Sequence, residues 1–214
     1  VAVRAGSQRV KNKNIRKFAN TNLLELKLNV LKKVNNLDKI IVNSDCDKMI
    51  EVALRHGVEA HKRQAYYASS EATNSEFHGH IGETTDSEVI FLAPVCSPFV
   101  SVQAHEKAID YYYNNNFDSV TSVADVKNHL WLNGKPLNYD LRQVPNSQDL
   151  PDIVKLTYGI TIVDRSVMRD ESRVVGNNPG FYKLNDIESV DIDTEFDFLL
   201  AEMMHEKGLS DVGF

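Results

Sequence analysis

Short apolar segments alternate with helix-forming segments up to about residue 126, and this alternation limits the folds open to the chain. Alternating βα units predict an α/β domain, with a mostly parallel sheet and flanking helices. The length of 214 residues favours one domain over residues 1–214 rather than two. After an opening strand at residue 1, strands are expected at 38–42, 58–60, 89–92 and 118–123, and helices from residues 22, 50, 73 and 102.

The opening strand leads directly into a basic loop. Six of the fourteen residues from 4 to 17 are Lys or Arg, although the net charge of the chain is −6. Open α/β sheets bind ligands outside the carboxyl ends of their strands, so this loop is expected to hold phosphate groups. Gly6 would let the backbone approach a phosphate, Ser7 adds a hydroxyl donor, and Arg4 and Lys13 supply positive charge. The alternative is a solvated basic turn.

Composition and missing motifs exclude several classes. The acidic balance argues against a nucleic-acid-binding protein, and no apolar run is long enough to span a membrane. Neither a GxGxxG nor a GxxxxGK[ST] motif is present. The two cysteines, Cys46 and Cys96, lack the spacing of a zinc site or a disulfide framework, so a cytoplasmic protein is expected. Because the sequence opens within a strand, residues before Val1 are also expected.

A second group of candidate residues lies near the end of the chain, at Asp191-Ile192-Asp193. In an extended segment, side chains two residues apart point to the same side, so both carboxylates can face one cation while Ile192 packs into the core. Mg²⁺ commonly takes one or two carboxylates and completes its shell with phosphate oxygens and waters. The alternative is that Asp193 or Thr194 only caps the last helix.

The βα alternation stops near residue 127. Residues 129–136 carry a hairpin signal and residues 138–151 are polar, so an arm is expected at 127–156, for dimerisation or for the acceptor site. A core strand at 158–163 and a short helix from 166 follow. The last helix is expected to begin after Thr194, with an apolar face formed by Phe196, Leu199, Leu200 and Met203.

Five segments, spread over nearly the whole chain, resemble the motifs of the acylneuraminate cytidylyltransferases, the CMP-sialic acid synthetases and their relatives. Residues 4–15 (R-A-G-S-Q-R-V-K-N-K-N-I) are similar to A-R-x-G-S-K-R-x-x-x-K-N, and residues 189–197 (S-V-D-I-D-T-E-F-D) are similar to S-I-D-I-D-T-x-x-D. The others are 42–45 (V-N-S-D), 63–69 (R-Q-A-Y-Y-A-S) and 94–98 (P-V-C-S-P), which resemble V-S-T-D, R-P-x-x-L-A-x-D and Q-P-T-S-P.

The resemblance implies a Rossmann-like nucleotidyltransferase fold and transfer of CMP from CTP to a sialic acid-type 2-keto sugar acid, with release of pyrophosphate. It also implies Mg²⁺ as cofactor and a homodimer. Lys13 would act in catalysis beside Asp191 and Asp193, which would hold the metal. The implied nucleotide-binding residues are Arg4, Gly6, Ser7, Arg9, Asn14, Arg63 and Asn74. The implied acceptor-binding residues are Ser97, Gln148, Lys155 and Tyr158.

Departures from the motifs concern the substrates more than the reaction. Gln8 replaces a Lys of the first motif, residues 93–98 lack the Gln of Q-P-T-S-P, and Lys155 stands where an Arg is expected. Thr157-Tyr158 replaces Asn-Gly. The acceptor could therefore be legionaminic, pseudaminic or 3-deoxy-octulosonic acid, or an acid outside the sugar class. An alternative of another kind is a non-catalytic nucleotide- or sugar-binding module.

Overall fold

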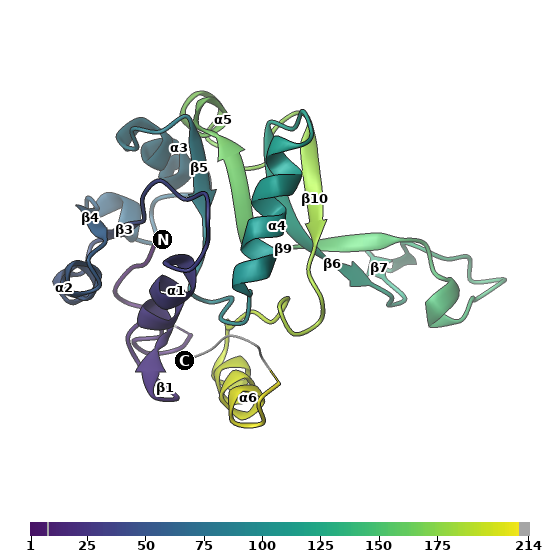
Figure 1. Ribbon diagram of the computed structural model, residues 1–214. Coiled ribbons are helices and arrows are strands. Elements are labelled where there is room, and N and C mark those ends of the chain that lie inside the picture. The colour runs from purple at the N-terminus through teal and green to yellow at the C-terminus, as the bar shows by residue number, and fades with distance from the viewer. Residues whose placement is uncertain (8, 210–214) are drawn as a thin grey trace.

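Within residues 1–7 and 9–209, which the computed structural model describes, the central sheet has four strands between flanking helices (Figure 1). In spatial order they are β10 (Pro179–Lys183), β6 (Ser119–Val126), β9 (Ile153–Asp164) and β5 (Val89–Leu92). β9 runs antiparallel to β5 and β6, and β10 runs parallel to β6. Thus β5, β6 and β10 share one direction, as expected of a mostly parallel sheet, and β9 is the exception.

A second, parallel pair of strands, β3 (Ile41–Ser44) and β4 (Glu59–Lys62), carries the opening segment of the chain. Ala2 bridges Asn43 in parallel, and the Val3 N–H donates to the carbonyl of Asn43 (3.0 Å). The chain therefore leaves β3 at the same end as the Ser44–Asp45 turn. The residues that follow Val3 begin the basic loop, so this loop and the end of β3 are neighbours.

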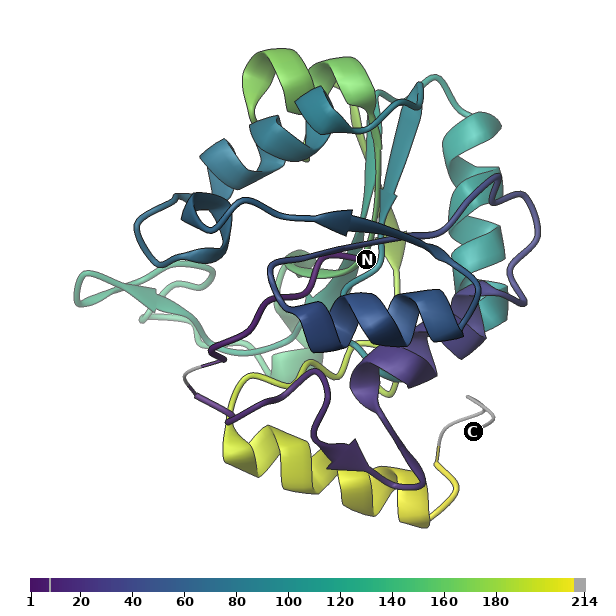
Figure 2. The same cartoon turned by 90° about the vertical axis from the view of Figure 1, so that its left-hand side faces the viewer.

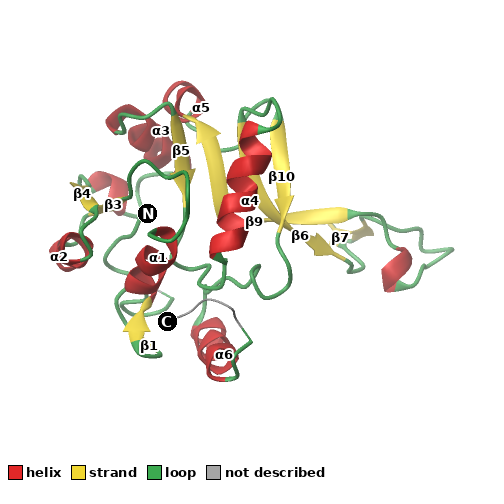
Figure 3. Ribbon diagram, viewed as in Figure 1, coloured by secondary structure: helices red, strands yellow, loops and turns green. Residues whose placement is uncertain are grey.

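Six helices are described (Figure 3), and three of them begin at N-caps that the sequence indicates, whereas the helix expected from residue 50 begins at Asp47 without a side-chain cap. The Asn22 side chain accepts from the N–H of Glu25, and both Thr73 and Thr194 form reciprocal capping boxes. The helices are α1 (Leu23–Leu31), α2 (Asp47–Arg55), α3 (Asn74–Thr84), α4 (Val102–Tyr113), α5 (Arg165–Glu171) and α6 (Glu195–Glu206). Short 3₁₀ turns lie at η1 (Tyr66–Ala68) and η2 (Ser147–Asp149). In the described part of the chain, no helix combines the length and apolar character needed to cross a bilayer.

Helix α6 lies at the opposite end of the protein from α3 and α5 (Figure 2). The sequence prediction for its buried face is wrong. Phe198 and Ala201 are fully buried, and Phe198 packs edge-on against Phe18, with ring centroids 5.5 Å apart. The buried face of α6 is therefore narrow and includes Phe198 and Ala201, whereas the larger apolar face faces solvent. Its members are Phe196 (72% exposed), Leu199 (54%), Leu200 (40%) and Met203 (59%).

The expected arm extends away from the sheet (Figure 1). It contains the predicted hairpin, formed by β7 (Trp131–Leu132) and β8 (Lys135–Pro136), followed by η2. Large apolar side chains on this arm are exposed in the single chain, and they are Trp131, Leu132, Leu137, Leu141 and Val144. Such a concentration of exposed apolar side chains on a projecting element is typical of an interaction surface.

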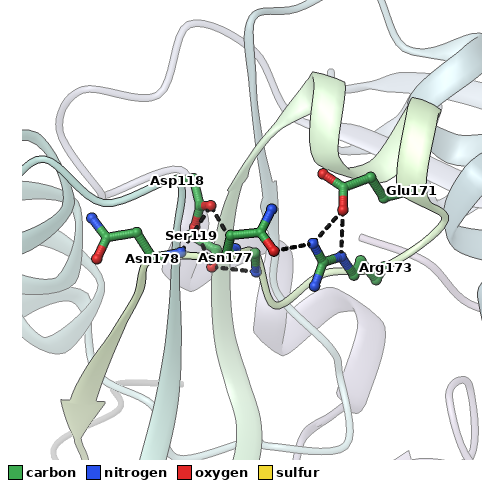
Figure 4. Close-up of polar contacts among 7 residues, drawn as sticks. Asp118, Ser119, Glu171, Arg173, Asn177 and Asn178 are labelled. Carbon is green, nitrogen blue, oxygen red and sulfur yellow. Dashed lines mark hydrogen bonds and ion pairs between the residues drawn. The ribbon is translucent and has the colours of Figure 1, made fainter.

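A polar network fixes β10 against the amino end of β6 (Figure 4). The Asp118 carboxylate accepts from the backbone N–H groups of Asn177 (2.6 Å) and Asn178 (3.0 Å), and the Ser119 hydroxyl accepts from that of Gly176 (2.8 Å). A Cβ at Gly176 would lie 2.1 Å from Oδ1 of Asp118, so only glycine fits there. This network closes the end of the sheet opposite to the carboxyl ends of β5, β6 and β10.

Candidate active site

The basic loop and the late aspartate segment meet at one place. The ammonium of Lys13 donates to the carbonyl oxygen of Ile192 (2.6 Å), and the Arg9 guanidinium pairs with the Asp193 carboxylate (2.8 Å). These contacts join residues 179 and 184 apart in sequence. The fold therefore brings a cluster of cations next to two carboxylates at one surface.

The conformation of the basic loop is fixed by contacts within the loop and with the end of β3. Gly6 has a φ of +72°, in the left-handed region that favours glycine, and its missing Cβ would meet open space. The amide of Asn14, which is buried, donates to the Arg4 carbonyl (3.1 Å) and so ties the two ends of the loop together. The N–H of Ala5 donates to the Asp45 carboxylate (3.0 Å). Gln8 lies outside the described residues.

Two further cations lie at this site, Arg4 at the start of the loop and Arg63 beside it. The Arg4 guanidinium donates to the carbonyls of Ala68 (2.9 Å) and Ser69 (3.0 Å). Arg63 is 5% exposed, donates to the side chain and backbone oxygens of Asn43 (2.6 and 2.8 Å), and lies over the ring of Phe77. Burial lowers the pKa of Arg63 to about 10, with the charge of Asp45 acting in the opposite direction. Asn74 is exposed at the first residue of α3.

The aspartate segment is anchored by its central residue. Ile192 is fully buried, and its N–H donates to the carbonyl of Cys96 (2.9 Å). The cap of α6 is formed by the Thr194 hydroxyl together with Asp197, so the Asp193 side chain is not the cap. The pKa of Asp191 is raised, chiefly by burial and also by the charge of Asp193, while its hydrogen bond with Cys96 opposes the rise.

The donor set fits a divalent cation that is shared with phosphate groups. Among residues 1–7 and 9–209, no group of three or more His, Cys, Asp and Glu side chains could enclose a metal by itself. Asp191 and Asp193 therefore offer two carboxylates and leave the remaining ligands to a substrate and water, which is how Mg²⁺ is commonly bound. A cation between these carboxylates would also offset the repulsion that raises the pKa of Asp191.

The candidate acceptor residues are only partly assembled within one chain. Ser97 is 2% exposed. A Cβ at Gly159 would lie 3.4 Å from Cβ of Ser97, so the adjacent Tyr158, which is 45% exposed, lies near that turn. Lys155 is exposed on the same strand, β9. Gln148 lies in η2 on the projecting arm, and the fold of one chain does not bring it to the other candidates.

Tyr158 has an unusual backbone. Its φ is +54°, in the left-handed region that bulky side chains rarely occupy. The pairing of β9 with β6 shifts register at this point. The Ser122 hydroxyl fills the gap, since it accepts from the N–H of Ile160 (3.0 Å) and bonds the hydroxyl of Thr157 (2.7 Å). The bulge therefore turns Tyr158 outward next to the site.

Sequence reasoning missed Lys27, which is fully buried and donates to the carbonyl of Ser97 (2.9 Å). A signal was available, because Lys27 lies three residues after Leu24 and four before Leu31 and so shares the inward face of α1. Asp45, which fixes the basic loop, was also not selected.

Comparison with known proteins shows which proteins this chain is similar to. A family model described as cytidylyltransferase matches residues 1–143. Post-translational flagellin modification protein B of Campylobacter coli is 25% identical, over 98% of this chain and 95% of that protein. CMP-N,N'-diacetyllegionaminic acid synthase of Campylobacter jejuni is 24% identical, over 95% of this chain and 92% of that protein. N-acylneuraminate cytidylyltransferase A of Danio rerio is 24% identical, over 94% of this chain but 49% of that protein.

Solved structures share the fold at low sequence identity. A CMP:2-keto-3-deoxy-manno-octonic acid synthetase, complexed with CTP, superposes with a TM-score of 0.73 at 10% identity, covering 97% of both chains. The 4-diphosphocytidyl-2C-methyl-D-erythritol synthase of Anaerococcus prevotii gives 0.70 at 14% identity, covering 96% of this chain and 95% of that one. The α/β nucleotidyltransferase fold expected from the sequence is therefore confirmed.

Proposed function

The chain belongs to the cytidylyltransferase family, and on that premise we propose that it transfers CMP from CTP to a 2-keto sugar acid of the sialic acid type and releases pyrophosphate. Residues 1–214 would act as one cytidylyltransferase domain. The observation that carries the proposal is the contact between the two motifs, in which Lys13 holds the Ile192 carbonyl and Arg9 pairs with Asp193. This contact sets phosphate-binding cations beside a carboxylate pair, as a metal-dependent phosphoryl transfer requires.

The basic loop would bind the triphosphate. Arg4, Gly6, Ser7 and Arg9 provide guanidinium, backbone and hydroxyl donors on one loop. The Lys13 ammonium has three N–H donors and uses one of them on Ile192, which leaves others for the α-phosphate. Asn14, Arg63 and Asn74 would contact the cytidine nucleotide.

Asp191 and Asp193 would hold Mg²⁺. When bound, the cation supplies positive charge to the phosphate oxygens and to the departing pyrophosphate. Arg9 already pairs with Asp193, so it can exchange this carboxylate for a phosphate once the cation takes its place. The surface pair costs little to break, because both side chains are substantially exposed.

The reaction is then an in-line displacement. The acceptor's hydroxyl oxygen attacks the α-phosphorus and loses its proton, while the bond from that phosphorus to the bridging oxygen breaks and releases pyrophosphate. Lys13 would neutralise charge that develops on the α-phosphate, and the fixed loop would hold the nucleotide in line with the acceptor. Positioning and charge neutralisation would supply most of the rate.

The acceptor would lie near Tyr158 and Ser97, with the Lys155 ammonium as a point charge for its carboxylate. One relative is named for diacetyllegionaminic acid, which supports an acid of the sialic acid type and keeps legionaminic acid as the leading alternative. The arm places Gln148 away from its own site, which supports a homodimer in which the arm reaches the partner's acceptor site. Sparse cysteine usage supports a cytoplasmic location.

Pyrophosphate release tests the proposal directly. Purified protein is incubated with CTP, Mg²⁺ and a panel of acids: N-acetylneuraminic, legionaminic, pseudaminic and 3-deoxy-octulosonic acid, and pyruvate as a non-sugar acid. Release that depends on CTP and on one sugar acid is expected, and the responding acid identifies the substrate. ATP and UTP in place of CTP serve as nucleotide controls. If no acid supports release, the protein is a binding module and the proposal fails.

A further inference from the structure

Helix α1 buries a cation in the core of the protein. Lys27 is 0% exposed and lies on the inward face of α1 with Leu24 and Leu31. Within the described residues, no carboxylate forms an ion pair with its ammonium, and its one hydrogen bond goes to the carbonyl of Ser97 (2.9 Å). A buried ammonium without a counter-ion is costly, and an apolar side chain of similar length would pack at less cost.

The groups around Lys27 do not balance its charge. Cys96 and His105 interact with Lys27, and neither side chain is a carboxylate. His105 is buried and neutral, because burial and the charge of Lys27 lower its pKa to about 3. Burial lowers the pKa of Lys27 itself to about 8, as expected for an ammonium held without an anion.

The hydrogen bond of Lys27 connects it, through Ser97 and Cys96, to the aspartate segment. Ser97, whose carbonyl it holds, follows Cys96 directly, and the Cys96 carbonyl accepts from the N–H of Ile192 (2.9 Å). The Cys96 thiol also forms a hydrogen bond with Asp191. The Cys96–Ser97 turn is therefore held from the core by Lys27, and it in turn holds the segment that carries both carboxylates.

We infer that Lys27 is a positioning residue, which fixes the Cys96–Ser97 turn and, through it, the metal-binding geometry of Asp191 and Asp193. The inference rests on the proposed function, because it requires that these carboxylates hold the metal. Lys27 touches neither substrate and is buried beneath the site. Loss of the Lys27 ammonium should loosen the carboxylate pair. Mutation of a residue that orients metal ligands typically weakens metal affinity by about 10- to 100-fold.

The test replaces Lys27 with Met, which keeps the length and removes the ammonium, and with Gln, which keeps an N–H donor without the charge. Lys32→Met is the matched control, since Lys32 follows α1 and donates to a carbonyl (of His56, 3.0 Å), but is exposed. Two quantities are measured: the Mg²⁺ concentration that half-saturates pyrophosphate release, and the Kd for Mn²⁺ in the presence of CTP by calorimetry. Melting temperature is recorded for every variant.

Lys27→Met is expected to melt at or above the wild-type temperature while both metal constants rise by about 10-fold or more. Lys27→Gln should show a smaller rise in both metal constants than Lys27→Met, and Lys32→Met should have the metal constants of the wild type. Unchanged metal constants in Lys27→Met overturn the inference, as does a fall in melting temperature and activity without a change in Mn²⁺ affinity. If Lys27→Met does not fold, Lys27→Gln decides by the same criteria. A wild-type protein that binds Mn²⁺ but releases no pyrophosphate refutes the proposed reaction only, and one that binds no Mn²⁺ overturns the inference.

Discussion

The ammonium of Lys13 lies 2.6 Å from the carbonyl oxygen of Ile192, so the basic loop is fastened to the segment before the last helix. Removing the ammonium should remove both this tether and the charge beside the α-phosphate. We expect Lys13→Ala to lower kcat by about 10²- to 10³-fold, the usual effect of losing a donor that acts on transition-state charge. Steady-state kinetics with CTP and the responding acid measures this effect.

Lys17→Ala is the control for that experiment, because Lys17 is an exposed lysine four residues farther along the same segment. It should keep the wild-type kcat. A change in Lys13→Ala that is confined to KM would assign Lys13 to ground-state binding alone.

The Asp193 carboxylate should be needed for turnover but not for folding. Its pairing with Arg9 is a surface ion pair, and such pairs contribute about 0–1 kcal/mol to stability. The cap of α6 is formed by Thr194 and Asp197, so it survives the substitution. We expect Asp193→Asn to abolish pyrophosphate release with a melting temperature near that of the wild type.

Glu195→Gln is the matched control for Asp193→Asn. Glu195 is the first residue of α6 and, like Asp193, pairs with an arginine, Arg16 (2.6 Å), but it lies outside the carboxylate pair. Activity should be retained in this variant. Full activity in Asp193→Asn would show that this carboxylate is not a metal ligand.

Tyr158 should show opposite effects on stability and on acceptor binding. A left-handed backbone at a non-glycine residue costs about 1–2 kcal/mol, and glycine avoids this cost but loses about 0.5–1 kcal/mol in chain entropy. Tyr158→Gly should therefore fold at least as stably as the wild type. If the exposed ring contacts the acceptor, KM for the acid should rise several-fold while KM for CTP stays constant.

Ser172→Gly provides the comparison, because Ser172 has a similar φ of +53° at the end of α5. It should give a similar change in stability with no change in either KM. An unchanged KM for the acid in Tyr158→Gly would remove Tyr158 from the acceptor site.

Local signals explain why much of the fold could be predicted. Hydrogen-bonding side chains at Asn22, Thr73 and Thr194 mark helix starts, and each forms the cap that its sequence context indicates. The hairpin at residues 131–136 follows from an Asn-Gly turn, in which Asn133 and Gly134 both have positive φ. These features depend on residues a few positions apart, so the sequence alone contains them.

Features that depend on distant residues were harder to predict. Which side of α6 is buried depends on Phe18, which precedes Phe198 by about 180 residues. The exposure of the apolar stripe in a single chain could not be predicted, because apolar residues at helical spacing usually indicate a buried face. A lysine within a leucine-rich helix suggests an exposed position, and Ser97, the partner that Lys27 has in the fold, lies 70 residues away in the sequence. The resemblance to family motifs selected Lys13 and Asp193, but their contacts came from the fold.

The arm provides a test of oligomeric state. Leu132 and Leu141 are each 58% exposed in the single chain, which is unfavourable unless a partner covers them. We expect light scattering to give twice the mass of one chain for the wild type, and the mass of one chain for Leu132→Asp/Leu141→Asp. Leu199→Asp alters the other exposed apolar surface, on α6, and should remain dimeric. A monomeric wild type, or a dimer lost only with Leu199→Asp, would contradict the assignment to the arm.

His105 should make the protein sensitive to acid. It is fully buried, its Nε2 has no hydrogen-bond partner among the described residues, and its pKa falls from the usual 6.5 to about 3, through burial and the charge of Lys27. Between these two values the unfolded chain binds a proton that the folded protein does not, so stability falls as pH is lowered from 6.5, by up to about 1.4 kcal/mol per pH unit. Above pH 6.5 the ring is neutral in both the folded and the unfolded chain, so this histidine no longer makes stability depend on pH.

His105→Leu removes the titrating ring while the carbonyl that it contacts, of Ser101, keeps the N–H of residue 105 as a donor. Urea unfolding at several pH values between 4.5 and 7.5 should therefore give a shallower loss of stability for this variant than for the wild type. His129→Leu, at an exposed histidine on the arm, should follow the wild-type curve. If the free energy of unfolding falls equally with pH in His105→Leu and in the wild type, the carboxylates alone account for the acid sensitivity. His105 would then be protonated in the folded protein as readily as in the unfolded one.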